Sequence, residues 1–281
     1  MKSALITIHP GKPRGVSVAL RLLDALSQCG IQPYVDDALF SICAERFPKY
    51  GENVESGAGA LIALGGDGTI LRAMPLAMRL SLPLLGINTG RIGFLAESDE
   101  TQLAEIALRL SKDDYRTDER MLLSVRVGGS EYLALNDAVL HRAASPHMIV
   151  LDAFVSNDLV GRYIADGMIV SSPTGSTGYS LSAGGPIVSP DVRCLVLSPI
   201  CPHTLQSRPV VVSDKEEITL RLSSEAIDGM TLSIDGQTAI EILGGAEINV
   251  SASKKTAKFI RLGEPRYFTL VREKLTEWSR S

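Results

Sequence analysis

An aspartate stands among three glycines at the point where an apolar run of the sequence ends. Residues 61–69 read LIALGGDGT, so Asp67 follows a segment typical of a buried strand and precedes apolar residues at helical spacing. Glycine permits backbone angles closed to other residues, or the close approach of a bound group. The pattern predicts a charged Asp67 that accepts a proton from a hydroxyl or helps to hold a metal.

The same position suits phosphate. A helix N-terminus carries partial positive charge, which favours a carboxylate or a phosphate beside it, and the glycine N–H groups around Asp67 would line such a group. The alternative is a tight turn in which Asp67 only caps the helix that follows.

A second stretch is dense in hydroxyl groups. Between Ser171 and Ser182 the chain places seven serines and threonines among glycines and a proline. Short hydroxyl side chains both donate and accept hydrogen bonds, which suits ribose, adenine edges and phosphate. A flexible linker is the alternative, but Tyr179, Leu181 and the apolar residues 168–170 favour a folded segment.

Several common motifs are missing. No G-x-G-x-x-G follows a strand-like run, so the sequence lacks the dinucleotide-binding fingerprint of dehydrogenases. Pro13 follows Gly11-Lys12, which spoils a P-loop. Neither G-x-S-x-G nor H-E-x-x-H occurs, and the four histidines are scattered. Neither a hydrolase nucleophile nor this zinc motif is therefore indicated.

The composition is that of a water-soluble protein large enough for two domains, with 281 residues of which 45% are hydrophobic. A net charge of -4 argues against nucleic acid as the main partner. No stretch approaches the roughly 20 apolar residues of a membrane span. The four cysteines form no C-x-x-C pair, which is typical of free thiols in a reducing cytoplasm. We expect a cytoplasmic protein without a membrane partner.

The elements that must position these residues change in type along the chain. In the first part, strand-like segments alternate with helical ones, which predicts a parallel, Rossmann-like sheet with ligands at the carboxyl ends of its strands. The expected strands are 4–8, 32–35, 60–64 and 84–87. The expected helices are 16–29, 70–80 and 99–110, the last capped by Ser98.

After residue 115 the pattern predicts a mainly antiparallel β domain, beginning with a hairpin of residues 122–127 and 132–140. Further expected strands are 149–155, 163–170, 194–197, 209–212, 217–222, 232–234 and 247–250. The amphipathic segment 267–278 is expected to return to the first domain. We therefore predict an α/β domain at 1–112, with 256–281 packed back on it, and a β-rich NAD-binding domain at 113–255, the ligand following from the resemblance described next.

The motifs together resemble those of the NAD kinases over nearly the whole chain. GGDGT alone is a weak signal, because lipid kinases share it, but a serine-rich signature about a hundred residues later makes the resemblance specific. The matching segments are 65–69 (GGDGT), 88–95 (NTGRIGFL), 136–137 (ND), 166–167 (DG), 172–186 (SPTGSTGYSLSAGGP), 207–209 (SRP) and 235–237 (DGQ).

The resemblance implies transfer of the γ-phosphoryl of ATP, or of another donor such as polyphosphate, to the 2'-hydroxyl of the adenosine ribose of NAD, which gives NADP. Asp67 matches the carboxylate that orients or deprotonates this hydroxyl. A divalent cation, with Mg²⁺ as the expected ion, would bridge donor phosphates without a dedicated protein cage.

The resemblance also implies the contacts to NAD and the assembly. The residues expected to hold the adenosine and neighbouring riboses are Gly68, Asn136, Asp137, Asp166, Thr177, Gly178, Tyr179, Ser180, Leu181 and Ser182. Arg72 is expected to contact phosphate or to be an ordinary helix-surface arginine. Gln237 would contact NAD from its own or a neighbouring subunit, since such proteins form homodimers or homotetramers.

Two positions depart from the family pattern. Gly178 stands where the signature usually has alanine, and Ile164 stands where relatives often carry a basic residue.

Two functions other than NAD phosphorylation are alternatives. A lipid or sphingoid-base kinase would keep Asp67 but not the segment 166–186, and a non-catalytic nucleotide-binding regulator would not need the intact aspartate.

Overall fold

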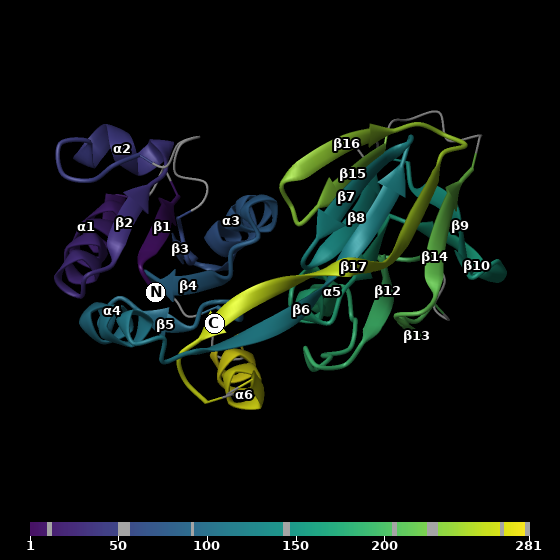
Figure 1. Ribbon diagram of the computed structural model, residues 1–281. Helices are drawn as coiled ribbons and strands as arrows, with labels where there is room; N and C mark the ends of the chain where they lie inside the picture. Colours follow the sequence, from purple (N-terminus) through teal and green to yellow (C-terminus); the bar gives the residue numbers. More distant parts are fainter. Residues whose placement is uncertain are drawn as a thin grey trace. The chain divides into compact units, whose positions relative to one another are not determined.

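The computed structural model describes residues 1–9, 13–49, 57–90, 93–142, 147–203, 207–223, 230–264 and 267–278. The chain divides into two compact units, which are described separately (Figure 1). The first comprises Met1–Glu119 together with Ala257–Ser281, and the second comprises Arg120–Thr256. Among the described residues, no helix combines the length and the apolar character needed to span a membrane.

The first unit is built on a parallel sheet in the order β2-β1-β3-β4. Its strands are β1 (Ser3–Ile8), β2 (Gln32–Val35), β3 (Leu61–Leu64), β4 (Leu84–Asn88) and the short β5 (Ser98–Asp99), which pairs with β4. Of these strands, β1, β3 and β4 are largely apolar and buried, as expected when helices cover both faces of a sheet. The end of β17 (Glu247–Arg261) also pairs with β4, through Phe259 and Leu84.

Helices pack on both faces of this sheet. The helices of the first unit are α1 (Pro13–Gln28), α2 (Asp37–Cys43), α3 (Asp67–Leu80), α4 (Leu103–Ser111) and α6 (Tyr267–Trp278). Leucines of α1 and α4, such as Leu22 and Leu110, share one core cluster with Ile6 and Ile62 of the strands. On the other face, α3 packs through Ile70 against Gly86, where a Cβ atom would lie 2.4 Å from the Ile70 side chain (Figure 1).

The strand order creates a switch point at the carboxyl edge of the sheet. From β1 the chain crosses through α1 to β2 on one side, and later enters β3 on the other side of β1. Ligands of open α/β sheets bind where the connections diverge in this way. His9 follows β1, and Asp67 follows β3 closely. This edge of the first unit is therefore the expected position of its functional residues.

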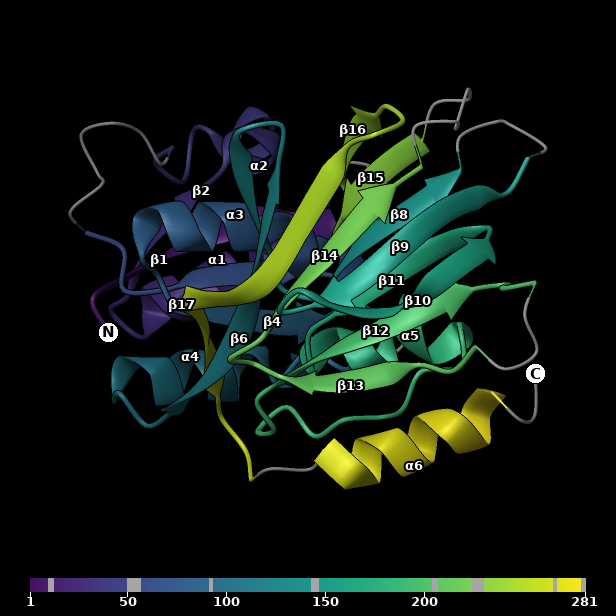
Figure 2. The same ribbon diagram turned by 90° about the vertical axis from the view of Figure 1, so that its right-hand side faces the viewer.

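The second unit consists of two antiparallel sheets that share a core. One sheet has the order β13-β12-β11-β8-β15-β16, and the other runs β10-β9-β14-β17 with β6 and β7 attached (Figure 2). Leu140 and Val170 of the first sheet pack in one cluster with Leu151 and Leu220 of the second. The strands are β6 (Arg116–Val127), which begins in the first unit, β7 (Ser130–Ala134), β8 (Asp137–Arg142), β9 (Ile149–Val155), β10 (Asp158–Ala165), β11 (Gly167–Ser171), β12 (Cys194–Ile200), β13 (Val210–Ser213), β14 (Glu217–Leu222), β15 (Met230–Ile234) and β16 (Thr238–Ile242).

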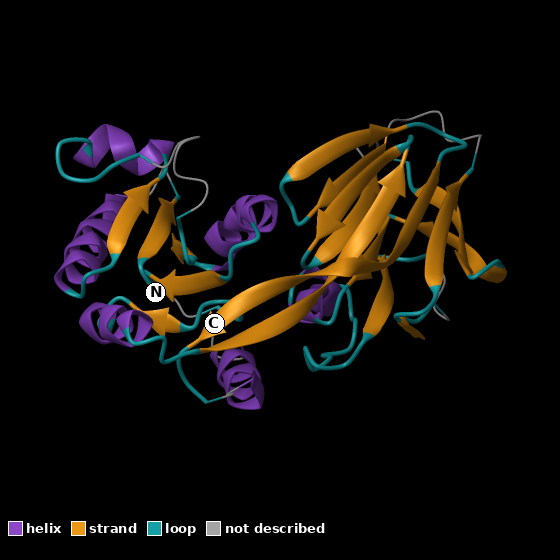
Figure 3. Ribbon diagram, viewed as in Figure 1, coloured by secondary structure: helices purple, strands orange, loops and turns teal. Residues whose placement is uncertain are grey.

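The hydroxyl-rich segment forms a short 3₁₀ helix at Thr174–Thr177 and one turn of helix, α5 (Tyr179–Ser182), which packs beside β11. The predicted fold class is confirmed: an α/β unit with a parallel sheet is combined with a mainly antiparallel β unit. Figure 3 shows strands dominating the second unit.

Several predicted elements need correction. The helix expected at 99–110 begins at Leu103, because Asp99 instead accepts a hydrogen bond from the N–H of Thr101 (2.8 Å) in a local turn. The expected strand 132–140 is interrupted at Leu135 and Asn136, and β7 and β8 belong to different sheets. The expected strand 163–170 is likewise interrupted at Asp166, between β10 and β11.

Other elements were missed or shortened by the sequence pattern. Neither α2 nor β16 was expected, and β17 extends far beyond the predicted strand 247–250. Because β17 is long, the same continuous strand pairs with β14 in the second unit and with β4 in the first.

Candidate active site

The carboxylate of Asp67 is held by backbone groups distant in sequence. Asp67 is the first residue of α3, after the extended Gly66. Its Oδ2 accepts a hydrogen bond from the N–H of Phe94 (2.8 Å), and its Oδ1 accepts one from the N–H of Leu95 (3.1 Å). No side chain caps α3 at its N-cap position. The carboxylate therefore binds the segment after β4 rather than capping its own helix.

The glycines around Asp67 are of two kinds. A Cβ atom at Gly93 would lie 1.9 Å from Oδ1 of Asp67, and one at Gly65 would lie 2.3 Å from Oγ1 of Thr69. These two glycines let the backbone approach closely. At Gly66 and Gly68, by contrast, an added Cβ would meet no atom of the described residues within 4 Å. The backbone beside Asp67 is therefore open to an incoming group.

Arg72 lies further along α3 and is exposed. Its Nη1 is 3.2 Å from Nε2 of His9, the residue that follows β1. A guanidinium can only donate hydrogen bonds, so Nε2 of His9 is the acceptor in this contact. The pair brings a positive charge to the carboxyl edge of the sheet. Arg91 and Ile92 of the predicted NTGRIGFL motif lie outside the described residues.

In the second unit, one aspartate organises the break between β7 and β8. The carboxylate of Asp235 accepts hydrogen bonds from the N–H groups of Leu135 (2.8 Å), Asn136 (2.7 Å) and Asp137 (3.2 Å). Asp235 and Gly236 both have positive φ and form the turn between β15 and β16. The predicted Gln237 is an exposed residue of this same turn. The turn thus fixes the backbone that carries Asn136 and Asp137.

Around this break lie polar groups that the protein itself does not satisfy. Oδ1 of Asn136 and Oγ of Ser171 are buried and have no hydrogen-bond partner among the described residues. Ser171 lies directly opposite Asp137 in the pairing of β11 with β8. Buried polar atoms without partners are rare in native proteins and call for a specific explanation. A bound polar ligand would supply the missing hydrogen bonds.

Asp137 is itself buried, with 6% of its surface exposed. Burial raises the pKa of Asp137 from 3.8 to about 7, and the negative charge of Asp235 adds to the rise. Burial also raises the pKa of Asp235, but its three backbone N–H donors oppose that rise. Asp235 is the member of the pair better suited to carry the charge, and Asp137 is the better proton carrier.

Most hydroxyls of the predicted serine-rich signature are used inside the protein. Oγ of Ser176 donates to the carbonyl of Pro173 (2.7 Å) and accepts from the N–H of Val188 (3.0 Å). Ser180 pairs with Ser198 at 3.1 Å. A Cβ atom at Gly175 would lie 2.1 Å from the carbonyl oxygen of Asn136, so this segment packs tightly on the β7–β8 break. The density of hydroxyls therefore serves local folding to a large extent.

The exposure of the predicted contact residues differs accordingly. Thr177 and Ser180 are buried, Gly178 and Leu181 are half-buried, and Tyr179 and Ser182 are exposed. Tyr179 exposes 48% of its surface, which is high for a large aromatic residue.

Asp166 lies at the other end of the β8–β11 pair from Asn136. Its carboxylate pairs with Arg142 (3.1 Å), and the register from Gly167–His141 to Ser171–Asp137 places four residue steps, about 14 Å, between the two ends. Within one chain, the structure therefore separates Asp166 from Asn136 and Asp137. Ile164, the departure from the family pattern, lies on β10 and is exposed.

Three residues of the site were not singled out from the sequence. Gly93 and Asp235 lie inside quoted motifs, so their presence there was the only signal. Ser171 stands at the head of the serine-rich stretch, and nothing in its spacing distinguishes it from its neighbours. Among the described residues, no group of three or more His, Cys, Asp or Glu side chains is arranged to hold a metal ion.

Comparison with known proteins assigns the chain to a family. The model of the ATP-NAD kinase N-terminal domain matches residues 5–115, and that of the ATP-NAD kinase C-terminal domain matches residues 135–262. The NAD kinase of Moorella thermoacetica is 40% identical over 95% of this chain and 86% of its own length. The NAD kinase of Heliobacterium modesticaldum is 37% identical over 99% of each chain.

Solved structures agree with this assignment. A yeast NADH kinase complexed with NADH superimposes with a TM-score of 0.87 at 27% identity, covering 98% of this chain and 88% of its own. An NAD kinase from Archaeoglobus fulgidus in complex with ATP superimposes with a TM-score of 0.76 at 26% identity, covering 98% of both chains. The predicted resemblance is confirmed, and the chain belongs to the ATP-NAD kinase family of phosphotransferases.

Proposed function

We propose that this chain, as an NAD kinase, transfers the γ-phosphoryl group of ATP to the 2'-hydroxyl of the adenosine ribose of NAD, with Asp67 as the group that receives the hydroxyl proton. The observation that carries the proposal is the carboxylate of Asp67, fixed by the N–H groups of Phe94 and Leu95 beside the open backbone of Gly66 and Gly68. The relatives complexed with ATP and with NADH support the choice of donor and acceptor class.

The geometry of Asp67 suits this role. A carboxylate offers about four acceptor positions, and the two backbone N–H groups occupy two of them. The others are available to orient the attacking hydroxyl. As the new P–O bond forms, the bond from the γ-phosphorus to the bridging oxygen breaks, ADP departs, and the hydroxyl proton passes to Asp67. Phosphoryl transfer depends mostly on positioning and charge neutralisation, and the exposed guanidinium of Arg72 supplies positive charge at this edge.

A divalent cation fits this arrangement only as a partner of the donor. Mg²⁺ keeps several waters and is commonly held by one or two carboxylates together with substrate phosphates. The described residues offer the carboxylate of Asp67 directly after β3 and no group of three or more metal-ligand side chains, which suits a cation that arrives with ATP. When bound, Mg²⁺ neutralises phosphate charge.

We propose that the predicted contact residues bind NAD: Gly68, Asn136, Asp137, Asp166, Thr177, Gly178, Tyr179, Ser180, Leu181, Ser182 and Gln237. The strongest support for these contacts lies at the β7–β8 break. The unsatisfied atoms of Asn136 and Ser171 beside Asp137 are suited to ribose hydroxyls or an adenine edge. The proposal of polyphosphate as a second phosphoryl donor is supported only by the family resemblance. A cytoplasmic location is supported by the exposed free thiol of Cys201, which a reducing compartment protects from oxidation.

The test of the proposal is Asp67→Asn. Asparagine keeps the shape and one acceptor oxygen, so it can retain the hydrogen bond from one of the two N–H groups, but it removes the charge and the proton acceptor. We expect kcat for NADP formation to fall by roughly 10²–10⁴, the usual size of a general-base contribution, while the melting temperature and the affinity for NAD stay close to those of the parent protein. Diacylglycerol with labelled ATP serves as the lipid-kinase control substrate and should give no product.

Asp36→Asn is the matched control. Asp36 follows β2 at the same edge and caps α2, accepting from the N–H of Leu39 (3.0 Å) and from Oγ1 of Thr7 (2.6 Å). Asparagine is among the best N-cap residues, so this variant should retain full activity. Full activity of Asp67→Asn would sink the proposed mechanism, because a neutral amide that cannot take up the hydroxyl proton would then suffice.

A further inference from the structure

Arg261 is a buried arginine near the end of β17, with 8% of its surface exposed. Its Nη1 lies 3.1 Å from Oε2 of Glu97, and its Nε lies 3.3 Å from Oδ2 of Asp118. Burying a charge is costly unless it is paired and hydrogen-bonded. The two carboxylates meet that need, so the guanidinium is held in one place. All three residues belong to the first unit.

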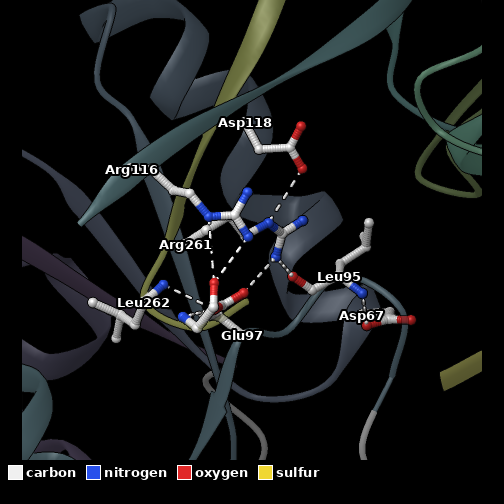
Figure 4. A network of polar contacts seen from close by, with 8 residues as sticks. Asp67, Leu95, Glu97, Arg116, Asp118, Arg261 and Leu262 are labelled. Atoms are coloured by element: carbon white, nitrogen blue, oxygen red, sulfur yellow. Dashed lines mark hydrogen bonds and ion pairs between the residues drawn. The ribbon is translucent and has the colours of Figure 1, made fainter. Parts of the chain in front are cut away.

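The same guanidinium reaches the segment that holds Asp67. Nη1 of Arg261 donates to the carbonyl oxygen of Leu95 (3.3 Å), and the N–H of Leu95 donates to Oδ1 of Asp67 (3.1 Å) (Figure 4). Leu95 is therefore the link between the two side chains. Arg261 does not contact Asp67 itself, and its influence on the carboxylate passes through one residue of backbone.

Glu97 secures the other end of this segment. Its Oε1 accepts hydrogen bonds from the N–H groups of Leu262 and Gly263, each at 2.8 Å, while its own N–H donates to the carbonyl of Gly86 (2.9 Å). The segment 94–97 is thus tied to β4 through the carbonyl of Gly86. It is also tied to the end of β17 through Arg261 and Leu262 (Figure 4).

We infer that Arg261 is a positioning residue for phosphoryl transfer, holding Leu95 so that the N–H groups of Phe94 and Leu95 keep the carboxylate of Asp67 aimed at the attacking hydroxyl. This inference rests on the role proposed above for Asp67. The planar guanidinium serves Glu97, Asp118 and the carbonyl of Leu95 at once. A lysine at this position would keep the charge, but its three N–H donors radiate from one nitrogen and would not reproduce that planar fork.

The test is a double-mutant cycle of Arg261→Lys and Asp67→Asn, scored by kcat for NADP formation. Lysine still compensates the two partly buried carboxylates, so the variant should fold. We expect Arg261→Lys alone to lower kcat by about tenfold to a hundredfold with little change in KM for NAD, the size of effect that a slight misplacement of a reacting group produces. In the Asp67→Asn background the same substitution should change kcat by less than about twofold, because groups that act as a unit are not additive.

Arg116→Lys is the matched control. Arg116 donates to the carbonyl of Gly263 in the same corner of the first unit but does not bond to Leu95, and it is exposed. Its kcat should stay close to that of the parent protein. An equal loss from Arg261→Lys in both backgrounds, or a kcat near the parent value in the single variant, would overturn the positioning role. Full activity of Asp67→Asn alone would instead contradict the role proposed for Asp67 as the proton acceptor.

Discussion

Gly93 has no side chain, and a Cβ atom there would lie 1.9 Å from Oδ1 of Asp67. No side chain could occupy that position unless the carboxylate or the backbone of the following two residues moved. Because those residues, Phe94 and Leu95, also provide the N–H donors to Asp67, the glycine and the two hydrogen bonds depend on one another. The absence of a side chain at residue 93 therefore allows the carboxylate of Asp67 to keep its orientation.

We therefore expect Gly93→Ala to lower kcat by about tenfold to a hundredfold, since the alanine methyl must displace the carboxylate. KM for NAD should change much less, because among the proposed NAD contacts only Asp67 is displaced. Gly15→Ala is the control, since its Cβ would lie 4.0 Å from the nearest side chain and α1 tolerates alanine. Parent-like kcat in Gly93→Ala would contradict the importance of this approach.

The break between β7 and β8 shows how an element boundary becomes a site. Where the chain leaves one sheet for the other, the N–H groups of residues 135–137 would lose their ladder partners, and Asp235 accepts all three. The arrangement places two carboxyl groups, Asp137 and Asp235, in one buried region. A proton on Asp137 relieves their repulsion, as the raised pKa of that group indicates.

This pair predicts a specific dependence of stability on pH. Below about pH 4 Asp137 is protonated in both the folded and the unfolded chain. Between about pH 4 and pH 7 the unfolded chain releases the proton while the folded chain retains it, so the free energy of unfolding declines. The decline reaches up to about 4 kcal/mol for the rise of the pKa from 3.8 to about 7.

Asp137→Asn should remove this part of the decline, measured by denaturant unfolding at pH 5 and pH 8 with circular dichroism. The variant should be more stable than the parent protein at pH 8, and the difference should shrink at pH 5. Asp158→Asn, at an exposed carboxyl group of the same unit, should leave the pH dependence unchanged. Identical pH profiles for Asp137→Asn and the parent protein would rule out the protonated pair.

At the scale of the whole molecule, the second unit has a sheet edge that bears on assembly. β10 is the terminal strand of its sheet, and it exposes Leu159 and Ile164 with 59% and 42% of their surface accessible. Proteins normally cover or pair such edges, because unpaired strands with apolar side chains associate with other chains. This edge is consistent with the homodimer or homotetramer that the family resemblance implies.

Sedimentation should therefore show a species larger than the 30.1 kDa chain at micromolar concentration. Leu159→Lys should shift the equilibrium toward monomer, since a charge on an edge strand opposes pairing. Leu243→Lys, at a leucine after β16 with 69% of its surface exposed, is the control and should leave the mass unchanged. A monomer alone, in the parent protein, would refute the proposed assembly.

Local features of the sequence determined the class of the fold and the identity of the central residue. The alternation of strand-like and helical segments indicated the parallel sheet, because the periods of strand and helix are visible within a few residues. The glycines around Asp67, between a strand and a helix, marked the start of α3. The motif spellings then indicated the family, since they combine residue types that chance does not bring together at those spacings.

Only the tertiary structure decided what those residues touch. Asp67 meets N–H groups 27 and 28 positions away, and Leu95 meets Arg261 166 positions away. Such contacts depend on which strands become neighbours, and no local period encodes that choice. The same reason explains the interrupted strands at Asn136 and Asp166, and the hydroxyls of Ser176 and Ser180 that fold back on the protein. The sequence by itself determined which groups are present, and the pairing of distant strands decided which of them face one another.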